Sequence, residues 1–310
     1  MPGDVTHLVL HLRTSRAKAR SAAAAEALTL LGDLGASAPA GGALAEGGGV
    51  FWIDLPATAL EAAQARLPRL GYTIAVERLG PPVAGTRTRL PVRWRHHYYS
   101  LTRLYEEEPE TARQSAPDRR KFLLETHGGH VREVAGYRGA GGPLSKRALA
   151  VCDARLLVNL VFTPEPGAIL LDPFAGAGGI VREARAGGWQ VISLDCDPAL
   201  RFGLAHLATL HCAADARNLP LANECLEAVA TEPPFDRQVE ALLPTALSEM
   251  WRVLKPRGRL ALLCAAWQAE VFRPHASALG LRCILDCPID RKGLGCVVLA
   301  WEKHGAGKTE

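Results

Sequence analysis

The chain has 310 residues, of which 48% are apolar and 22% are charged, values that are ordinary for a soluble globular protein. This length allows one large domain or two, and the lack of any run of about 18 apolar residues argues against a transmembrane helix. The chain starts with Met1-Pro2-Gly3-Asp4 and has no apolar signal segment, so we expect a cytoplasmic protein. Its 8 cysteines lie mostly in apolar runs, and no second pair accompanies Cys283 and Cys287, so we expect reduced thiols and no metal site.

The first part of the chain shows the pattern of a small α/β domain. The order of predicted elements is strand, helix, strand, helix, strand, at residues 6–13, 16–34, 50–55, 58–67 and 72–79. This order predicts a sandwich of ferredoxin-like type over residues 1–82, with one edge strand unaccounted for. Nothing in it suggests catalysis, and it could serve for packing or for positioning RNA.

Residues 83–140 form a second segment, with an unusual charge. Residues 87–147 hold 13 Lys and Arg against 7 Asp and Glu, so they carry the whole positive excess of a chain whose net charge is +4. Basic residues there alternate with rings, as in Arg119-Arg120-Lys121-Phe122. Cations meet phosphates and rings stack on unpaired bases, which favours an RNA-contacting segment. The alternative is a connector that packs its rings between domains and leaves its arginines in solvent.

From residue 141 onward, strands alternate with helices. A first helix is predicted at 146–160, and later helices at 180–186, 199–210 and 239–254. Strands are predicted at 168–171, 190–194, near 214, and at 226–231, 259–264, 282–287 and 296–301. This alternation, with a hairpin at its end, predicts a doubly wound, mostly parallel sheet in which ligands bind at the carboxyl ends of the strands.

Acidic residues follow four of these strands: Asp172, Asp195, Asp215 and Glu232. A glycine loop comes after the first of them, and by itself it could be only an αβ turn. A dinucleotide is a poor fit, because Val181 stands where Gly-x-Gly-x-x-Gly needs its last glycine and a pyrophosphate would be repelled by these acids.

S-adenosylmethionine fits the acids better, since it offers a sulfonium and an ammonium. Asp195 would then bind the ribose hydroxyls and Asp215 the adenine amine, while Gly176 and Gly178 let the backbone approach the methionine portion. The residues expected to bind this cofactor are Asp172, Phe174, Gly176, Gly178, Asp195, Asp215 and Ala216.

Two motifs carry a family resemblance: Asp172-Pro173-Phe174-Ala175-Gly176-Ala177-Gly178-Gly179-Ile180 and Glu232-Pro233-Pro234-Phe235. Together they resemble the class I methyltransferases that modify exocyclic amino groups. With the preceding Asp153-Ala154-Arg155-Leu156-Leu157-Val158-Asn159-Leu160, they resemble the tRNA guanosine-N2 methyltransferases of archaea and eukaryotes that act on the tenth nucleotide. The resemblance covers residues 137–301. It implies a Rossmann-like fold with a seven-stranded, mostly parallel sheet over residues 141–310, S-adenosylmethionine as donor and tRNA as substrate.

The second motif departs from the family pattern, because its first position is usually Asp or Asn and here it is Glu232. In the family mechanism, this side chain and the carbonyl of Pro233 accept hydrogen bonds from the base amine, while Phe235 stacks on the extruded base. We therefore expect Glu232, Pro233, Pro234 and Phe235 to be the catalytic residues. Two alternatives stay open: a DNA or other amino methyltransferase, since DNA adenine methyltransferases share this pattern, and a non-catalytic RNA-binding protein that retains the fold.

Overall fold

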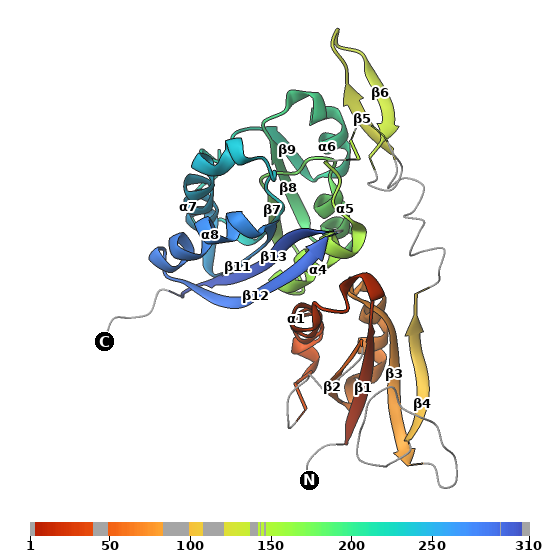
Figure 1. Cartoon of the computed structure of the whole chain (residues 1–310). Coiled ribbons are helices and arrows are strands. Elements are labelled where there is room, and N and C mark those ends of the chain that lie inside the picture. Colours follow the sequence, from red (N-terminus) through yellow and green to blue (C-terminus); the bar gives the residue numbers. More distant parts are fainter. Residues whose placement is uncertain are drawn as a thin grey trace. The chain divides into compact units, whose positions relative to one another are not determined.

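The structure is a computed structural model, and it describes residues 4–39, 49–82, 99–107, 121–136, 142, 144–145, 147–291 and 293–305. The chain divides into two compact units, residues 1–112 and 113–310. Figure 1 shows both units in ribbon form. None of the described helices is long and apolar enough to span a membrane.

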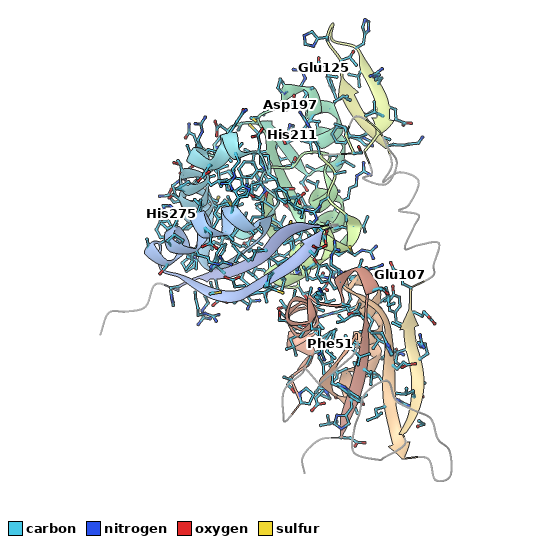
Figure 2. The ribbon with its side chains drawn as sticks, in the orientation of Figure 1. Phe51, Glu107, Glu125, Asp197, His211 and His275 are labelled. Carbon is cyan, nitrogen blue, oxygen red and sulfur yellow. The ribbon has the colours of Figure 1, made fainter. Side chains whose placement is uncertain are left out.

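The first unit is built on a four-stranded antiparallel sheet with the order β2-β1-β3-β4. Its strands are β1 (Val5–Leu12), β2 (Val50–Pro56), β3 (Thr73–Pro82) and β4 (Tyr99–Glu106), and its helices are α1 (Arg20–Leu30) and α2 (Leu60–Arg66). Alternating or apolar strand sequences bury one face of the sheet, including Phe51 of β2, which is labelled in Figure 2. Glu26 of α1 is fully buried, and its carboxylate accepts hydrogen bonds from the backbone amides of Gly71 and Tyr72 at 2.6 and 3.1 Å. The small α/β domain expected from the sequence is therefore present, and β4 is its missing edge strand.

The second unit contains a seven-stranded sheet with the order β12-β13-β11-β10-β7-β8-β9. The strands are β7 (Ile169–Asp172), β8 (Gln190–Asp195), β9 (Leu210–Ala213), β10 (Leu226–Thr231), β11 (Leu254–Ala265), β12 (Leu281–Arg291) and β13 (Leu294–Lys303). All neighbours pair in parallel except β13, which is antiparallel to both β11 and β12. The first strand of this sheet, β7, lies beside the central strand β10, and the chain winds outward from this point in both directions, so β7 and β10 flank the switch point.

Helices cover both faces of this sheet (Figure 1). On one face are α4 (Val151–Val161), α5 (Gly179–Ala186) and α6 (Arg201–Leu207), and on the other are α7 (Leu243–Val253) and α8 (Ala266–Ala278). The apolar stripe of α7 and α8 packs on β10, β11 and β13 in one core cluster that includes Met250, Phe272 and Trp301. This strand order and layering confirm the predicted Rossmann-like fold of class I methyltransferases.

A short hairpin precedes this sheet in the second unit. It consists of β5 (Lys121–Glu125) and β6 (Val131–Ala135), which lie in the segment expected to be a connector. Phe122 of β5 is only 2% exposed, and a Cβ added to Gly203 of α6 would lie 2.3 Å from its ring, so the glycine makes room for the phenylalanine. The ion pair between Arg201 and Glu125, whose label in Figure 2 marks the hairpin, adds a second contact to α6. Phe122 is thus a packing residue and cannot stack on a base.

The structure differs from the prediction in three details of this unit. The helix predicted to reach residue 210 ends at Leu207, because Leu210 already pairs with Ile192 as the first residue of β9. Residues Lys255-Pro256-Arg257-Gly258, between the predicted helix and the predicted strand, lie inside β11, where the register with β10 shifts. Helix α8 had no predicted counterpart. The boundaries predicted at residues 82 and 140 stay predictions, and Arg119 and Arg120 of the basic segment lie outside the described residues.

Candidate active site

The carboxyl ends of β7, β8 and β10 meet at one edge of the sheet. Asp172 is the last residue of β7, Asp195 is the last residue of β8, and Glu232 directly follows β10. Because β7 and β10 are neighbours, Thr231 Oγ1 can donate a hydrogen bond of 2.8 Å to Asp172 Oδ1. The structure therefore brings three of the four predicted acids to the switch point, as the fold requires.

Asp172 is the most buried of these acids, with 1% of its surface exposed. Besides Thr231, the backbone amide of Phe174 donates to its Oδ1 at 3.3 Å. Burial disfavours the ionised form and outweighs these hydrogen bonds, so it raises the pKa of Asp172 to about 7, and the negative charge of Asp195 adds to the effect. A cation bound beside Asp172 would stabilise its ionised form and lower its pKa.

The glycine loop is held in place by Asp195. The Asp195 carboxylate accepts hydrogen bonds from the amides of Gly176 and Asp197, each at 2.9 Å. Gly176 and Gly178 have φ angles of 52° and 71°, in the region that favours glycine. A Cβ on Gly176 would also lie 2.9 Å from the carbonyl oxygen of Arg147. Both glycines are therefore needed for the shape of the loop.

The remaining predicted cofactor residues differ in how they are placed. Phe174 is half-buried and packs against the core, and Ala216 is 5% exposed. Asp215 follows β9, but Arg217 takes up its carboxylate, with Nε 3.0 and 3.1 Å and Nη2 2.6 Å from its oxygens. This ion pair lowers the pKa of Asp215, and a contact with an adenine amine would have to compete with it. Asp197 accepts from the amide of Ala199 at 3.0 Å and so caps the short 3-10 helix Pro198–Leu200.

The turn after β10 is fixed by residues from distant parts of the chain. The Pro234 carbonyl accepts a hydrogen bond of 2.8 Å from Gln268 Nε2, while Gln268 Oε1 accepts one of 2.9 Å from the amide of Ala265. Within the part of the chain that the structure describes, the carbonyl of Pro233 accepts no hydrogen bond. Its acceptor is therefore unused by the described residues, whereas the carbonyl of Pro234 is engaged.

Glu232 makes an ion pair with Arg291, whose side chain is 4% exposed. Arg291 Nε also lies 3.4 Å from Asp153 Oδ2, and its guanidinium carbon is 5.7 Å from the centre of the Phe235 ring. Reasoning from the sequence missed both Arg291 and Gln268. Arg291 lies between the two last predicted strands and Gln268 in no predicted element, and no spacing pattern links either of them to the motif at Glu232.

These residues fit S-adenosylmethionine in their chemistry. The ligand has two cationic groups, and the acids at the strand ends supply negative charge beside a loop that the glycines keep free of side chains. The burial of Asp172 is the structural observation that supports this fit, because its carboxylate is 1% exposed and, among the described residues, accepts hydrogen bonds from the uncharged Thr231 side chain and Phe174 amide, so a bound cation would stabilise its ionised form. Asp195 would hold the ribose and Gly176 with Gly178 would face the methionine portion. Among the described residues, no group of three or more His, Cys, Asp or Glu is arranged to hold a metal ion.

Comparison with known proteins gives one family match, to the methyltransferase domain over residues 171–262. Among solved structures, the chain is similar to TrmN from Thermus thermophilus, with 19% identity, 96% of this chain and 99% of that chain covered, and a TM-score of 0.47. It is also similar to the T. thermophilus 16S rRNA N2 G1207 methyltransferase RsmC (23% identity, 62% and 47% covered, TM-score 0.38) and to a geranyl diphosphate methyltransferase (13% identity, 50% and 79% covered, TM-score 0.42). The family match lies on the strands and loops described above, so residues 171–262 are similar to a methyltransferase domain, the fold is that of class I methyltransferases, and the cofactor is S-adenosylmethionine.

Proposed function

We propose that this S-adenosylmethionine-dependent methyltransferase modifies an exocyclic amine of a base in RNA, and that its substrate is the N2 group of a guanosine in tRNA. The observation that carries the proposal is the turn after β10. It presents the Glu232 carboxylate and the open carbonyl of Pro233 next to the half-buried ring of Phe235. Two acceptors beside a ring are what an aromatic amine needs, because its lone pair must be turned out of the base plane toward the donor.

The chain's own residues would have the following roles. The bound cofactor supplies an electrophilic methyl group. Glu232 and the carbonyl of Pro233 would accept hydrogen bonds from the two N–H groups of the amine, while Phe235 would pack on the face of the base. Gln268 occupies the Pro234 carbonyl, whereas the Pro233 carbonyl accepts no hydrogen bond from the described residues and would serve the substrate. Asp195 keeps the glycine loop at the donor side of the same edge.

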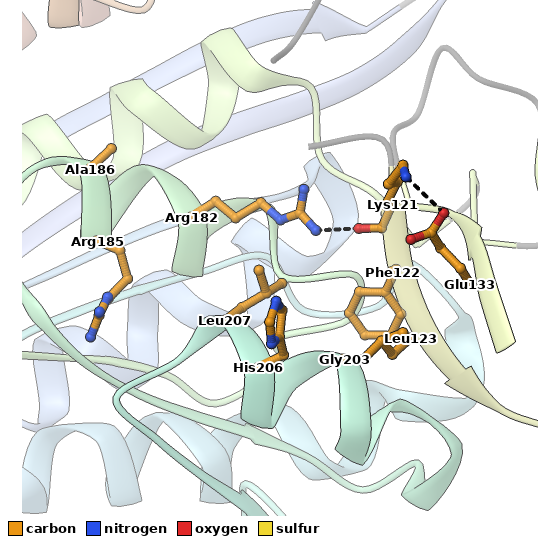
Figure 3. Close-up of a pocket in the computed structure, with 10 residues that line it drawn as sticks. All are labelled: Lys121, Phe122, Leu123, Glu133, Arg182, Arg185, Ala186, Gly203, His206 and Leu207. Atoms are coloured by element: carbon orange, nitrogen blue, oxygen red, sulfur yellow. Dashed lines mark hydrogen bonds and ion pairs between the residues drawn. The ribbon is translucent and has the colours of Figure 1, made fainter. Parts of the chain in front are cut away.

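An anionic polymer as substrate is supported by a cavity in the second unit. It has a volume of about 550 Å³ and lies between the β5–β6 hairpin and helices α5 and α6 (Figure 3). Lys121, Arg182, Arg185 and His206 line it, against the single carboxylate of Glu133. One nitrogen of Arg185 donates to Thr209 Oγ1 at 2.7 Å, and the exposed guanidinium has further donors to offer. A cationic cavity of this kind suits a backbone phosphate, in keeping with the positive excess of residues 87–147.

Methyl transfer from labelled S-adenosylmethionine to total tRNA that lacks the modification tests the proposal. We expect label in tRNA, and digestion should recover it in N2-methylated guanosine. Label in another nucleoside would change the identity of the target base but would support the proposed methyl transfer to RNA. Label only in DNA would favour the DNA methyltransferase alternative. Measurable donor binding with no transfer to any nucleic acid would refute the proposal and favour an RNA-binding protein that retains the fold.

A further inference from the structure

Arg291 is a buried cation held between two carboxylates that come from different elements. Its Nη1 pairs with Glu232 after β10, and its Nε faces Asp153 of α4 at 3.4 Å. Asp153 is fully buried and the Arg291 side chain is 4% exposed, so solvent screens these contacts very little. The guanidinium carbon also lies 5.7 Å from the centre of the Phe235 ring, so Arg291 lies near both Glu232 and Phe235, the two ends of the motif.

The tip of the β12–β13 hairpin brings Arg291 to this place. Cys296 of β13 pairs with Ala265, the last residue of β11, while Arg291 pairs with Leu294 beyond that point. The hairpin therefore extends past the end of β11. Since β12 runs in the same direction as β10, its last residue lies on the same edge as Glu232. A residue from an outer strand can thus contact the end of a central one.

We propose that Arg291 is a positioning residue that adapts the site to a glutamate at position 232. This inference rests on the proposed function. A glutamate carries its carboxylate one methylene further than the Asp or Asn of the related methyltransferases, and a displacement of about 1 Å can reduce a rate about 100-fold. Arg291 binds one carboxylate oxygen of Glu232, and Asp153 anchors the guanidinium from the other side. A carboxylate has about four acceptor sites, so Glu232 can still accept a bond from the amine.

The inference predicts that the aspartate usual in the family impairs this protein. In Glu232→Asp, the carboxylate would be drawn toward Arg291 or left short of it, and either position misplaces the acceptor. Arg291→Lys keeps the charge, but a single ammonium group cannot bridge Glu232 and Asp153 as the planar fork does. Both variants should therefore lose turnover and keep their binding of donor and RNA.

One arm of the test needs no catalysis. Thermal unfolding is compared for Arg291→Gln, Glu232→Gln and the double variant. Each single variant leaves the partner's charge buried with one contact fewer, so the double variant should lose less than the sum of the two single shifts in Tm. Additive shifts would show that the two side chains do not act together and would overturn the inference.

The second arm measures kcat and KM with the RNA acceptor. Glu232→Asp should lower kcat about 100-fold and Arg291→Lys roughly 10- to 100-fold, with KM for RNA and donor affinity changed less than about twofold. Arg273→Lys is the matched control, because Arg273 of α8 also bridges two carboxylates, Asp286 and Glu270, away from the motif. Wild-type turnover in Glu232→Asp, or equal losses in the two lysine variants, would overturn the inference. A wild-type protein without transferase activity would instead refute the proposed function, and the unfolding arm would still decide whether the contact exists.

Discussion

Replacing Asp172 by Asn should change the stability of the protein in a way that depends on pH. Asparagine keeps the oxygen that accepts from Thr231 and removes the ionisable group from a site that is 1% exposed. The pKa of Asp172 rises from an ordinary 3.8 to about 7 on folding, so the native state binds more protons than the unfolded state between these values. Stability of the wild type therefore falls as pH rises from about 4 to about 7, and is constant above that.

The size of the effect follows from the shift. About three pKa units correspond to roughly 4 kcal/mol between the extremes of pH, and to about 2 to 3 kcal/mol between pH 5 and pH 8. We expect the free energy of unfolding of Asp172→Asn, relative to wild type without donor, to increase by that amount over this range. Urea denaturation at the two pH values measures it, and titrations elsewhere in the protein cancel in the difference.

Asp215→Asn provides the control for this measurement. Arg217 lowers the pKa of Asp215, so that carboxylate is ionised in both native and unfolded states above about pH 5 and its difference curve should be flat. A constant stability difference between Asp172→Asn and wild type would refute the assignment of a raised pKa. The same assignment predicts that wild-type donor affinity increases as pH rises through about 7, and that the Asn variant loses this dependence.

Three further predictions concern the donor loop, the cavity and the hairpin. Asp195→Ala should weaken donor binding about 10- to 100-fold in calorimetry, because the ribose and the amide of Gly176 both lose a charged acceptor. Unchanged affinity would contradict the contact between Asp195 and the ribose. Arg185→Glu should weaken RNA binding and reduce the salt slope by about 1. The effect should exceed that of Arg132→Glu, an exposed residue of β6 that does not line the cavity, and equal effects would mean that the cavity binds no phosphate. Gly203→Ala should lower the free energy of unfolding by about 1 to 3 kcal/mol and speed hydrogen exchange in β5 and β6, because the added Cβ would meet the Phe122 ring. Unaltered exchange would show that this contact does not hold the hairpin.

The donor side of the site could be predicted because its determinants are local in sequence. A short apolar strand, an acid and glycines with left-handed φ angles define the loop at Gly176 and Gly178 within ten residues. The acids at the strand ends could be placed together as well, because parallel strands with helical crossovers deliver their carboxyl ends to one edge. The fold class followed from the same alternation of strands and helices.

Elements whose partners are distant in sequence were the ones missed. The strand β4 and the β5–β6 hairpin lie in a segment without clear periodicity, where register is set by pairing with β3 and by packing of Phe122 on Gly203. Helix α8 has Pro274 in its interior and a weak apolar stripe, so its local pattern does not predict a helix. Its packing against α7 and β13 decides the structure there.

The acceptor side of the site follows the same rule. Glu232 depends on Arg291, fifty-nine residues away, and the Pro234 carbonyl depends on Gln268, thirty-four residues away. Neither partner contributes to a local motif. The glutamate at position 232, in place of the usual Asp or Asn, therefore looks like a loss of function when it is judged from the motif alone. In the folded protein it has a buried counter-charge, itself held by Asp153. The glycine loop is therefore specified by one short stretch of sequence, whereas the geometry at Glu232 depends jointly on α4, α8 and the tip of the β12–β13 hairpin.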